Sequence, residues 1–138
     1  MPTLASLLVL AGLAVVLVLG GLHLLYTFRG TKLHPREPAA VKAMQQSGLV
    51  ITRQTTVWRA WIGFNASHSL GILLFALVYG YLALAAPALL FSSLFLRALG
   101  LAFLLAYVVL ARRYWFSVPF RGVVLATALY VAGLAAAL

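Results

Sequence analysis

The stretch Trp58–Leu84, WRAWIGFNASHSLGILLFALVYGYLAL, decides the fold of this chain. After a short aromatic and basic beginning, it continues as an apolar run from about residue 62 to residue 84. A helix rises about 1.5 Å per residue and a hydrocarbon core is about 30 Å thick, so this run is long enough to cross a bilayer. It also contains Asn65, Ser67, His68 and Ser69. Because polar groups are costly in hydrocarbon, we expect these side chains to face protein, water or a ligand.

The whole chain has the composition of a membrane protein. Of its 138 residues, 65% are hydrophobic and 8% are charged, whereas soluble domains have about 25% charged residues. Further apolar segments of bilayer length cover about residues 4–26, 89–110 and 118–138. The first of these has no basic residues before it and no small-residue cleavage site after it, which favours a membrane helix over a signal peptide. The sequence therefore predicts an all-α fold, in which residues 1–138 form one transmembrane domain, an integral membrane four-helix bundle.

The positive charges are concentrated in two of the predicted connections. Six of the ten Lys and Arg residues lie in the long polar connection at 29–60, and Arg112, Arg113 and Arg121 lie between the third and fourth spans. Cytoplasmic loops of membrane proteins carry such an excess of Lys and Arg. We therefore expect the loop 29–60 in the cytoplasm and both termini on the outer, periplasmic side. The formal charge of +9 then indicates contact with anionic lipid headgroups of the bilayer, and not with nucleic acid.

The inventory of reactive side chains excludes many kinds of catalysis. The chain has no cysteine, so it has no thiol nucleophile, disulfide exchange or thiolate metal site. Glu37 is its one acidic residue, which excludes paired-carboxylate hydrolysis and a di-iron carboxylate centre. The sequence has no Gly-rich phosphate loop, Ser-His-Asp arrangement or zinc-protease motif. No catalytic residue and no metal site are predicted.

Two histidines provide the main candidate site. His23 lies about four residues from the cytoplasmic end of the first span, and His68 lies about six to seven residues from that end of the second. Both therefore lie roughly 6 to 10 Å below the cytoplasmic surface. At about 100° per residue, Asn65 shares a helix face with His68 and Trp61. We predict a ligand-binding site formed by His23, Asn65 and His68, with Arg59 and Trp61 at its mouth.

The same residues are open to other interpretations. The two histidines could form a hydrogen-bonded pair between helices, assisted by Asn65, that fixes the rotation of the helices. They could also ligate one haem iron from both sides, clasp a metal or bind a quinone head. No cofactor is predicted, and haem is kept as an alternative. His34 lies in the polar connection, where we expect it to face solvent or lipid headgroups.

Arg97 lies within the third span, on the side of the membrane that has no other Lys or Arg by the predicted topology. No acidic side chain is predicted on that side either. We expect Arg97 to contact lipid phosphate, the carboxylate of Leu138, an anionic ligand or a partner protein. Together with Arg112, Arg113 and Arg121, it forms the predicted set of contacts with lipids or partners.

Small residues recur at a spacing of four on two of the predicted helices. One stripe is Gly63, Ser67 and Gly71 on the second span, and the other is Ala98, Ala102 and Ala106 on the third. Such stripes allow close helix contact in membranes. They can pack inside one chain or between two, so the sequence leaves open a homo-oligomer or a membrane partner subunit.

The long polar connection contains signals for one further helix. In HPREPAAVKAMQQSG, Pro38 can occupy the first turn and Gly48 can end the helix. We expect this short helix to lie on the membrane surface. Thr52 is then expected to cap a helix that continues into the second span.

Two runs of sequence resemble a known group of proteins. The runs LHLLYTFRGTKLHPREP at 22–38 and ITRQTTVWRAWIGFNASHSLG at 51–71 resemble the first half of a group of small bacterial four-span membrane proteins with no assigned activity. The resemblance covers about Leu22 to Leu84, and GFNASHSLG at 63–71 carries most of it. It implies a multi-pass protein of the bacterial inner membrane, and it implies no activity.

From these observations we expect a non-catalytic binding or accessory component of the membrane, with a polar site in the cytoplasmic half of the first two helices. One alternative is a small membrane enzyme or a haem-bearing electron carrier that uses His23 and His68. A second alternative is a transporter of a lipid-like or organic anion, which the basic residues near the mouth of the site support.

Overall fold

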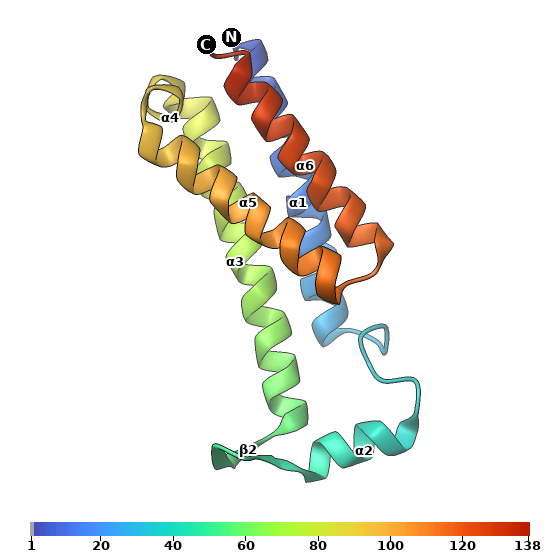
Figure 1. Cartoon of the computed structure of the whole chain (residues 1–138). Helices are drawn as coiled ribbons and strands as arrows, with labels where there is room; N and C mark the ends of the chain where they lie inside the picture. Colours follow the sequence, from blue (N-terminus) through green and yellow to red (C-terminus); the bar gives the residue numbers. More distant parts are fainter. Residues whose placement is uncertain (1) are drawn as a thin grey trace. The chain divides into compact units, whose positions relative to one another are not determined.

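The computed structural model describes residues 2–138, and this part of the chain is mainly helical (Figure 1). Its helices are α1 (Leu4–Phe28), α2 (Pro38–Gln46), α3 (Val57–Ala85), α4 (Pro87–Ser92), α5 (Leu94–Tyr114) and α6 (Ser117–Ala135). Between α2 and α3 lies a two-stranded antiparallel hairpin of β1 (Gly48–Leu49) and β2 (Thr52–Thr56).

Four of these helices, α1, α3, α5 and α6, are long and apolar enough to cross a membrane. The predicted helical class with four candidate spans is therefore confirmed, and it supports a multi-pass membrane protein. Some helix ends differ from the predicted ones, because a proline or a capping side chain decides where the helix begins. α5 begins at Leu94, and not near residue 89, because Pro87 starts the separate helix α4. The Ser93 side chain then caps α5 by accepting the backbone N–H of Leu96 at 3.2 Å.

The contacts divide the chain into two compact units. The core unit comprises the described residues up to Leu19 together with Ile72–Leu138, and the histidine unit comprises Gly20–Gly71. Both α1 and α3 contribute residues to each of the two units.

Apolar side chains from five helices are buried at the centre of the core unit. They are Val9, Leu13 and Val16 of α1, Ile72, Phe75, Ala76, Tyr79 and Ala83 of α3, Leu90 of α4, Leu104 of α5, and Ala126 and Tyr130 of α6. The ring of Phe75 also stacks on that of Phe103, with 4.2 Å between ring centroids. Aromatic pairs of this kind stabilise a contact beyond the area that they bury.

Within the core unit, α1 and α6 lie side by side and run in opposite directions (Figure 1). A Cβ atom placed on Gly133 would lie 2.9 Å from the carbonyl oxygen of Ala5, and one placed on Gly12 would lie 2.8 Å from that of Ala126. No side chain fits in such a gap, so the two glycines set how closely the backbones approach. In lipid, where apolar surfaces gain little by leaving the solvent, close packing of this kind is a main source of helix association.

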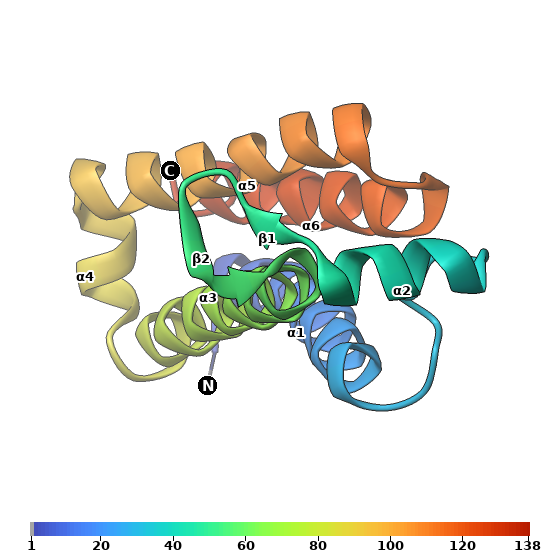
Figure 2. The ribbon, with the colours of Figure 1, turned by 90° about the horizontal axis from the view of Figure 1, so that it is seen from below.

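The histidine unit contains the end of α1, the beginning of α3 and the connection between them. Figures 1 and 2 show α2 lying across the direction of α3, next to the hairpin. α2 begins with Pro38 in its first turn and ends at Gln46, close to the predicted bounds. The prediction that Thr52 caps the next helix is wrong, because Thr52 lies in β2. Thr56 takes this role, and its hydroxyl oxygen accepts the backbone N–H of Arg59 at 3.3 Å.

The hairpin was not expected from the sequence pattern. Its strands are closed by a bond of 2.9 Å from the N–H of Val57 to the carbonyl oxygen of Ser47. Val50 and Ile51 form the turn, with relative exposures of 110% and 90%. Two large apolar side chains therefore stand fully exposed at the tip of this hairpin.

Both small-residue stripes are exposed in this chain. Gly63, Ser67 and Gly71 lie on the surface of the histidine unit, and Ala98, Ala102 and Ala106 lie on that of the core unit. Within residues 2–138, a Cβ atom placed on Gly63 would meet no atom closer than 4 Å. In the described part of the chain, the stripes therefore do not provide the tight contact between α1 and α6, which comes from Gly12 and Gly133.

Candidate functional site

The histidine unit brings together three of the predicted site residues on two helices. His23 of α1 and Asn65 of α3 are joined by a hydrogen bond of 2.9 Å between Nε2 and Oδ1. The ring of His68 meets that of His23 edge to face, with 5.4 Å between ring centroids and an interplanar angle of 74°. His23 and His68 therefore face each other, a point that the sequence left open. We call His23, Asn65 and His68 the histidine cluster.

The backbone fixes the direction of the hydrogen bonds in the histidine cluster. The Nδ2 group of Asn65 donates to the carbonyl oxygen of Trp61 at 2.8 Å, and a carbonyl oxygen can only accept. The Oδ1 atom of Asn65 must then face His23. Because an amide oxygen also only accepts, Nε2 of His23 is the donor in this bond. A neutral His23 ring therefore carries its proton on Nε2 and its lone pair on Nδ1.

Neighbouring hydroxyl groups are satisfied within their own helices. Thr27 donates to the carbonyl oxygen of His23 at 2.8 Å, and Ser69 donates to that of Asn65 at 3.0 Å. Both side chains are buried. Their hydroxyl protons are bonded to backbone carbonyl oxygens. The polar interactions of the site with a ligand therefore have to come from the two imidazoles and the amide.

The two residues predicted at the mouth differ in their relation to the histidine cluster. Trp61 supplies the backbone carbonyl that holds Asn65, and its ring is exposed. Arg59 is also exposed. At about 100° per residue, Arg59 lies about 120° around α3 from Asn65 and about 40° from Gly63. The structure thus places Trp61 beside the cluster and Arg59 on the face of the small-residue stripe.

The histidine cluster can exchange hydrogen bonds with an oxygen-bearing ligand. Two imidazoles and one amide provide donors and acceptors without a fixed charge. Among the residues that the structure describes, no group of three or more His, Cys, Asp or Glu side chains is placed to hold a metal ion. The edge-to-face contact of the rings leaves no room for a porphyrin between them. This arrangement therefore gives no support to a haem held by both histidines.

The arginines predicted to contact lipids or partners lie in the core unit. Arg112 lies over the ring of Phe120, with 5.8 Å from Cζ to the ring centroid, in the range of a cation–π contact. Arg113 and Arg121 are exposed. Arg97 differs from these three, because it is partly buried and its Nε atom has no hydrogen-bond partner within residues 2–138.

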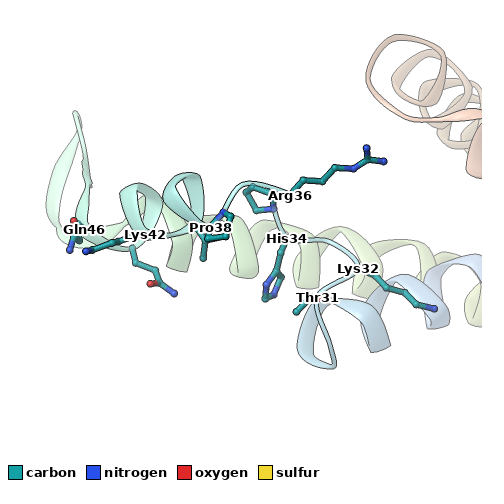
Figure 3. Close-up of a pocket in the computed structure, with 10 residues that line it drawn as sticks. Thr31, Lys32, His34, Arg36, Pro38, Lys42 and Gln46 are labelled. Atoms are coloured by element: carbon teal, nitrogen blue, oxygen red, sulfur yellow. The ribbon is translucent and has the colours of Figure 1, made fainter.

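An open groove of about 900 Å³ follows the connection between α1 and α2 and continues along α2. Lys32, Arg36, Lys42 and His34 are among its lining residues. Figure 3 shows Lys42 extending in the opposite direction from Lys32 and Arg36. The ring of His34 packs edge to face on Trp58, with 4.8 Å between centroids. Since the cations do not converge on one point, the groove has the character of a basic surface and not of a phosphate pocket.

Sequence reasoning missed the contacts of two buried tyrosines in the core unit. The hydroxyl of Tyr79 donates to the carbonyl oxygen of Leu96 at 2.8 Å, and that of Tyr130 donates to the carbonyl oxygen of Arg97 at 3.3 Å. Both rings lie against Gly100, where no side chain fits. The sequence contains one signal for these contacts. Both tyrosines lie inside apolar segments, whereas tyrosine in membrane proteins is common at the membrane interface.

No protein-family model, curated protein or solved structure matches this chain.

Proposed function

We propose that this chain is a non-catalytic, multi-pass membrane protein that binds the oxygen-bearing head group of a lipid-soluble molecule at the histidine cluster. The observation that carries the proposal is the bond between His23 and Asn65 beside the ring of His68, on two helices that are long and apolar enough to cross a membrane. Polar and ionisable side chains inside membrane helices are rare, and they usually mark a site.

The side chains of the histidine cluster favour a neutral or anionic oxygen group over a cation. The cluster contains no carboxylate, and Glu37, the one acidic residue of the chain, lies in the connection before α2. A quinone carbonyl, or the phosphate or hydroxyl group of a lipid, can accept a hydrogen bond from an imidazole N–H. All three cluster side chains are only partly buried, which leaves them accessible to such a group.

The proposed location is the inner membrane of a bacterium, with both termini in the periplasm and the connection between α1 and α3 in the cytoplasm. Six of the ten Lys and Arg residues in this connection, and three more around the junction of α5 and α6, support this orientation. The histidine cluster would then lie in the cytoplasmic half of the membrane. The basic groove along α2 would face anionic lipid headgroups, which attract such residues with about 1 kcal/mol each.

Single-cysteine variants test this orientation without background, because the native chain has no cysteine. Lys32→Cys and Arg112→Cys should react with a membrane-impermeant maleimide from the cytoplasmic side only. Ala88→Cys, in the exposed part of α4, should react from the opposite side. Labelling of positions 32 and 112 from opposite sides would contradict the orientation.

Native mass spectrometry of the purified full chain tests the binding proposal. We expect a co-purifying lipid-soluble molecule that the native chain retains and the His68→Ala variant loses. Ser67→Ala is the matched control, because Ser67 is exposed and its hydroxyl donates to the carbonyl oxygen of Phe64. Equal retention by the two variants would contradict the proposal. The cluster would then act only as a bond that fixes helix rotation.

Absorption spectroscopy of the same sample separates the proposal from its main alternative. A haem held by His23 and His68 gives a Soret band, which should disappear in either histidine variant. We expect no such band, since the two rings touch each other edge to face.

A further inference from the structure

Arg97 is a cation whose position the rest of the chain does not explain. It is the one Lys or Arg outside the connection at 29–60 and the junction of α5 and α6. Its Nε atom is buried and, in the described part of the chain, has no hydrogen-bond partner. A guanidinium group is always charged and has five N–H donors. Leaving a buried charged donor unpaired is costly, so a partner is expected.

The backbone that carries Arg97 is held by contacts with two other helices. Its own carbonyl oxygen accepts from Tyr130 of α6 at 3.3 Å, and that of Leu96 accepts from Tyr79 of α3 at 2.8 Å. Ser93 caps the same turn of α5 by accepting the N–H of Leu96 at 3.2 Å. The base of the Arg97 side chain is therefore fixed, unlike that of an arginine on an open surface.

The core unit contains no acidic side chain that could neutralise Arg97. The one acidic residue, Glu37, belongs to the histidine unit. The negative charge that neutralises Arg97 must therefore come from a group other than the side chains of the core unit. Near the ends of membrane helices, the abundant anionic oxygens are lipid phosphates, and long basic side chains extend toward them.

We propose that Arg97 binds the phosphodiester of a membrane lipid, at a site separate from the histidine cluster. A planar guanidinium donates from Nε and from one terminal nitrogen to two oxygens of the same phosphate. Because Nε is buried in the described structure and the residue is only partly buried, the side chain has to turn toward the lipid for this fork to satisfy Nε, the atom that the described residues leave unpaired. A lysine ammonium is a point charge and cannot form the fork.

Titration of the delipidated full chain in detergent tests this pairing. Phosphatidylglycerol supplies a lipid phosphodiester, diacylglycerol supplies apolar tails without phosphate, and inorganic phosphate supplies the free ion. We expect phosphatidylglycerol to bind the native chain at least about tenfold more tightly than the Arg97→Gln variant. Diacylglycerol should bind both chains equally. Competition by inorganic phosphate at the same concentration as the lipid would overturn the assignment to lipid.

Two further variants keep the test decisive. Arg53→Gln removes an exposed arginine of β2 that belongs to neither predicted site, so the affinity should change by less than about threefold. Arg97→Lys retains the charge and serves if Arg97→Gln does not fold, and we expect it to bind at least about threefold more weakly than the native chain. Native affinity in either Arg97 variant, or an equal loss in Arg53→Gln, would overturn the proposal.

Discussion

Replacing Gly133 with alanine is expected to push α1 and α6 apart in the core unit. The new Cβ atom would lie 2.9 Å from the carbonyl oxygen of Ala5 and 3.2 Å from the amide nitrogen of Val9. Favourable contacts between carbon atoms lie at about 3.5 to 4.0 Å. Both neighbours are backbone atoms of a helix and cannot rotate away, so relief of the clash requires one helix to move.

Gly63 provides the matched control, and comparison with it gives the expected loss of stability. A Cβ atom on Gly63 would meet no described atom within 4 Å, so Gly63→Ala adds the same methyl group without a clash. Exchange of Gly for Ala inside a helix stabilises it by about 0.5 to 1 kcal/mol, and this gain is common to both variants. Overpacking costs about 1 to 3 kcal/mol. Gly133→Ala should therefore be less stable than Gly63→Ala by that amount, roughly 5- to 150-fold in the unfolding equilibrium.

Unfolding in mixed micelles of a mild and a denaturing detergent, followed by circular dichroism, measures this difference. We expect a lower midpoint for Gly133→Ala than for Gly63→Ala. Gly12→Ala should also lower the midpoint, because its Cβ atom would lie 2.8 Å from the carbonyl oxygen of Ala126. If the three variants shared one midpoint, the backbones of α1 and α6 would not be in the contact described, and the reasoning would be refuted.

Two further predictions concern polar contacts between helices. In a double-mutant cycle of His23→Ala and Asn65→Leu, the coupling energy should lie near the values for such bonds in membranes, about 0.6 and up to about 1.7 kcal/mol, because the side chains bond at 2.9 Å. A coupling of zero in the detergent unfolding assay would contradict that bond. Tyr79→Phe should lower the unfolding midpoint by a similar energy, since it removes a bond of 2.8 Å. Tyr81→Phe, at a position that is 69% exposed, should not lower it, and equal midpoints would count against the role of Tyr79.

The four long helices could be predicted because hydropathy is summed over about 20 residues and tolerates local exceptions. Their ends could not be predicted in the same way, because each end depends on one or two hydrogen bonds. Ser93 caps α5 and Thr56 caps α3. In the sequence, Thr56 has the same capping chemistry as Thr52, and only the hairpin decides between them.

The hairpin itself lacks the usual signals. Two-residue hairpin turns commonly contain Asn-Gly, Asp-Gly or another pair with glycine, whereas this turn is Val50–Ile51. The β-branched residues that follow favour a strand, but the apolar pattern gives no reason for two large side chains to stand fully exposed. Backbone pairing between β1 and β2 therefore had to be seen in the structure.

For the histidine cluster, the depth of the side chains in the membrane could be predicted from the sequence. The rotation of α1 and α3 about their own axes could not. Depth follows from the position along a helix of known rise, which is why His23 and His68 were expected at similar levels. Rotation depends on which face of α1 packs against α3. Small residues at Gly63 and Gly71 mark a face that can pack closely, yet both are exposed. A spacing of four shows that a close approach is allowed, but it does not identify the partner.

The polar groups of the long helices differ in how much they reveal about function. Thr27, Ser69 and Thr127 each donate to the carbonyl oxygen four residues earlier in their own helix. Such bonds need no second helix and persist in any arrangement of the chain. The bond between His23 and Asn65 joins α1 to α3, so it forms only at one relative rotation of these two segments.

The binding that we propose at the histidine cluster would for this reason be linked to the packing of α1 on α3. A head group whose hydroxyl donates to the Nδ1 lone pair of His23 leaves the bond between His23 and Asn65 in place, and it should raise the unfolding midpoint by mass action. A head group that replaces the Asn65 amide should instead abolish the coupling between His23 and Asn65. Repeating the double-mutant cycle with saturating diacylglycerol, whose hydroxyl can donate, and with a saturating quinone, whose carbonyls only accept, distinguishes the two modes, because only the second mode reduces the coupling energy toward zero.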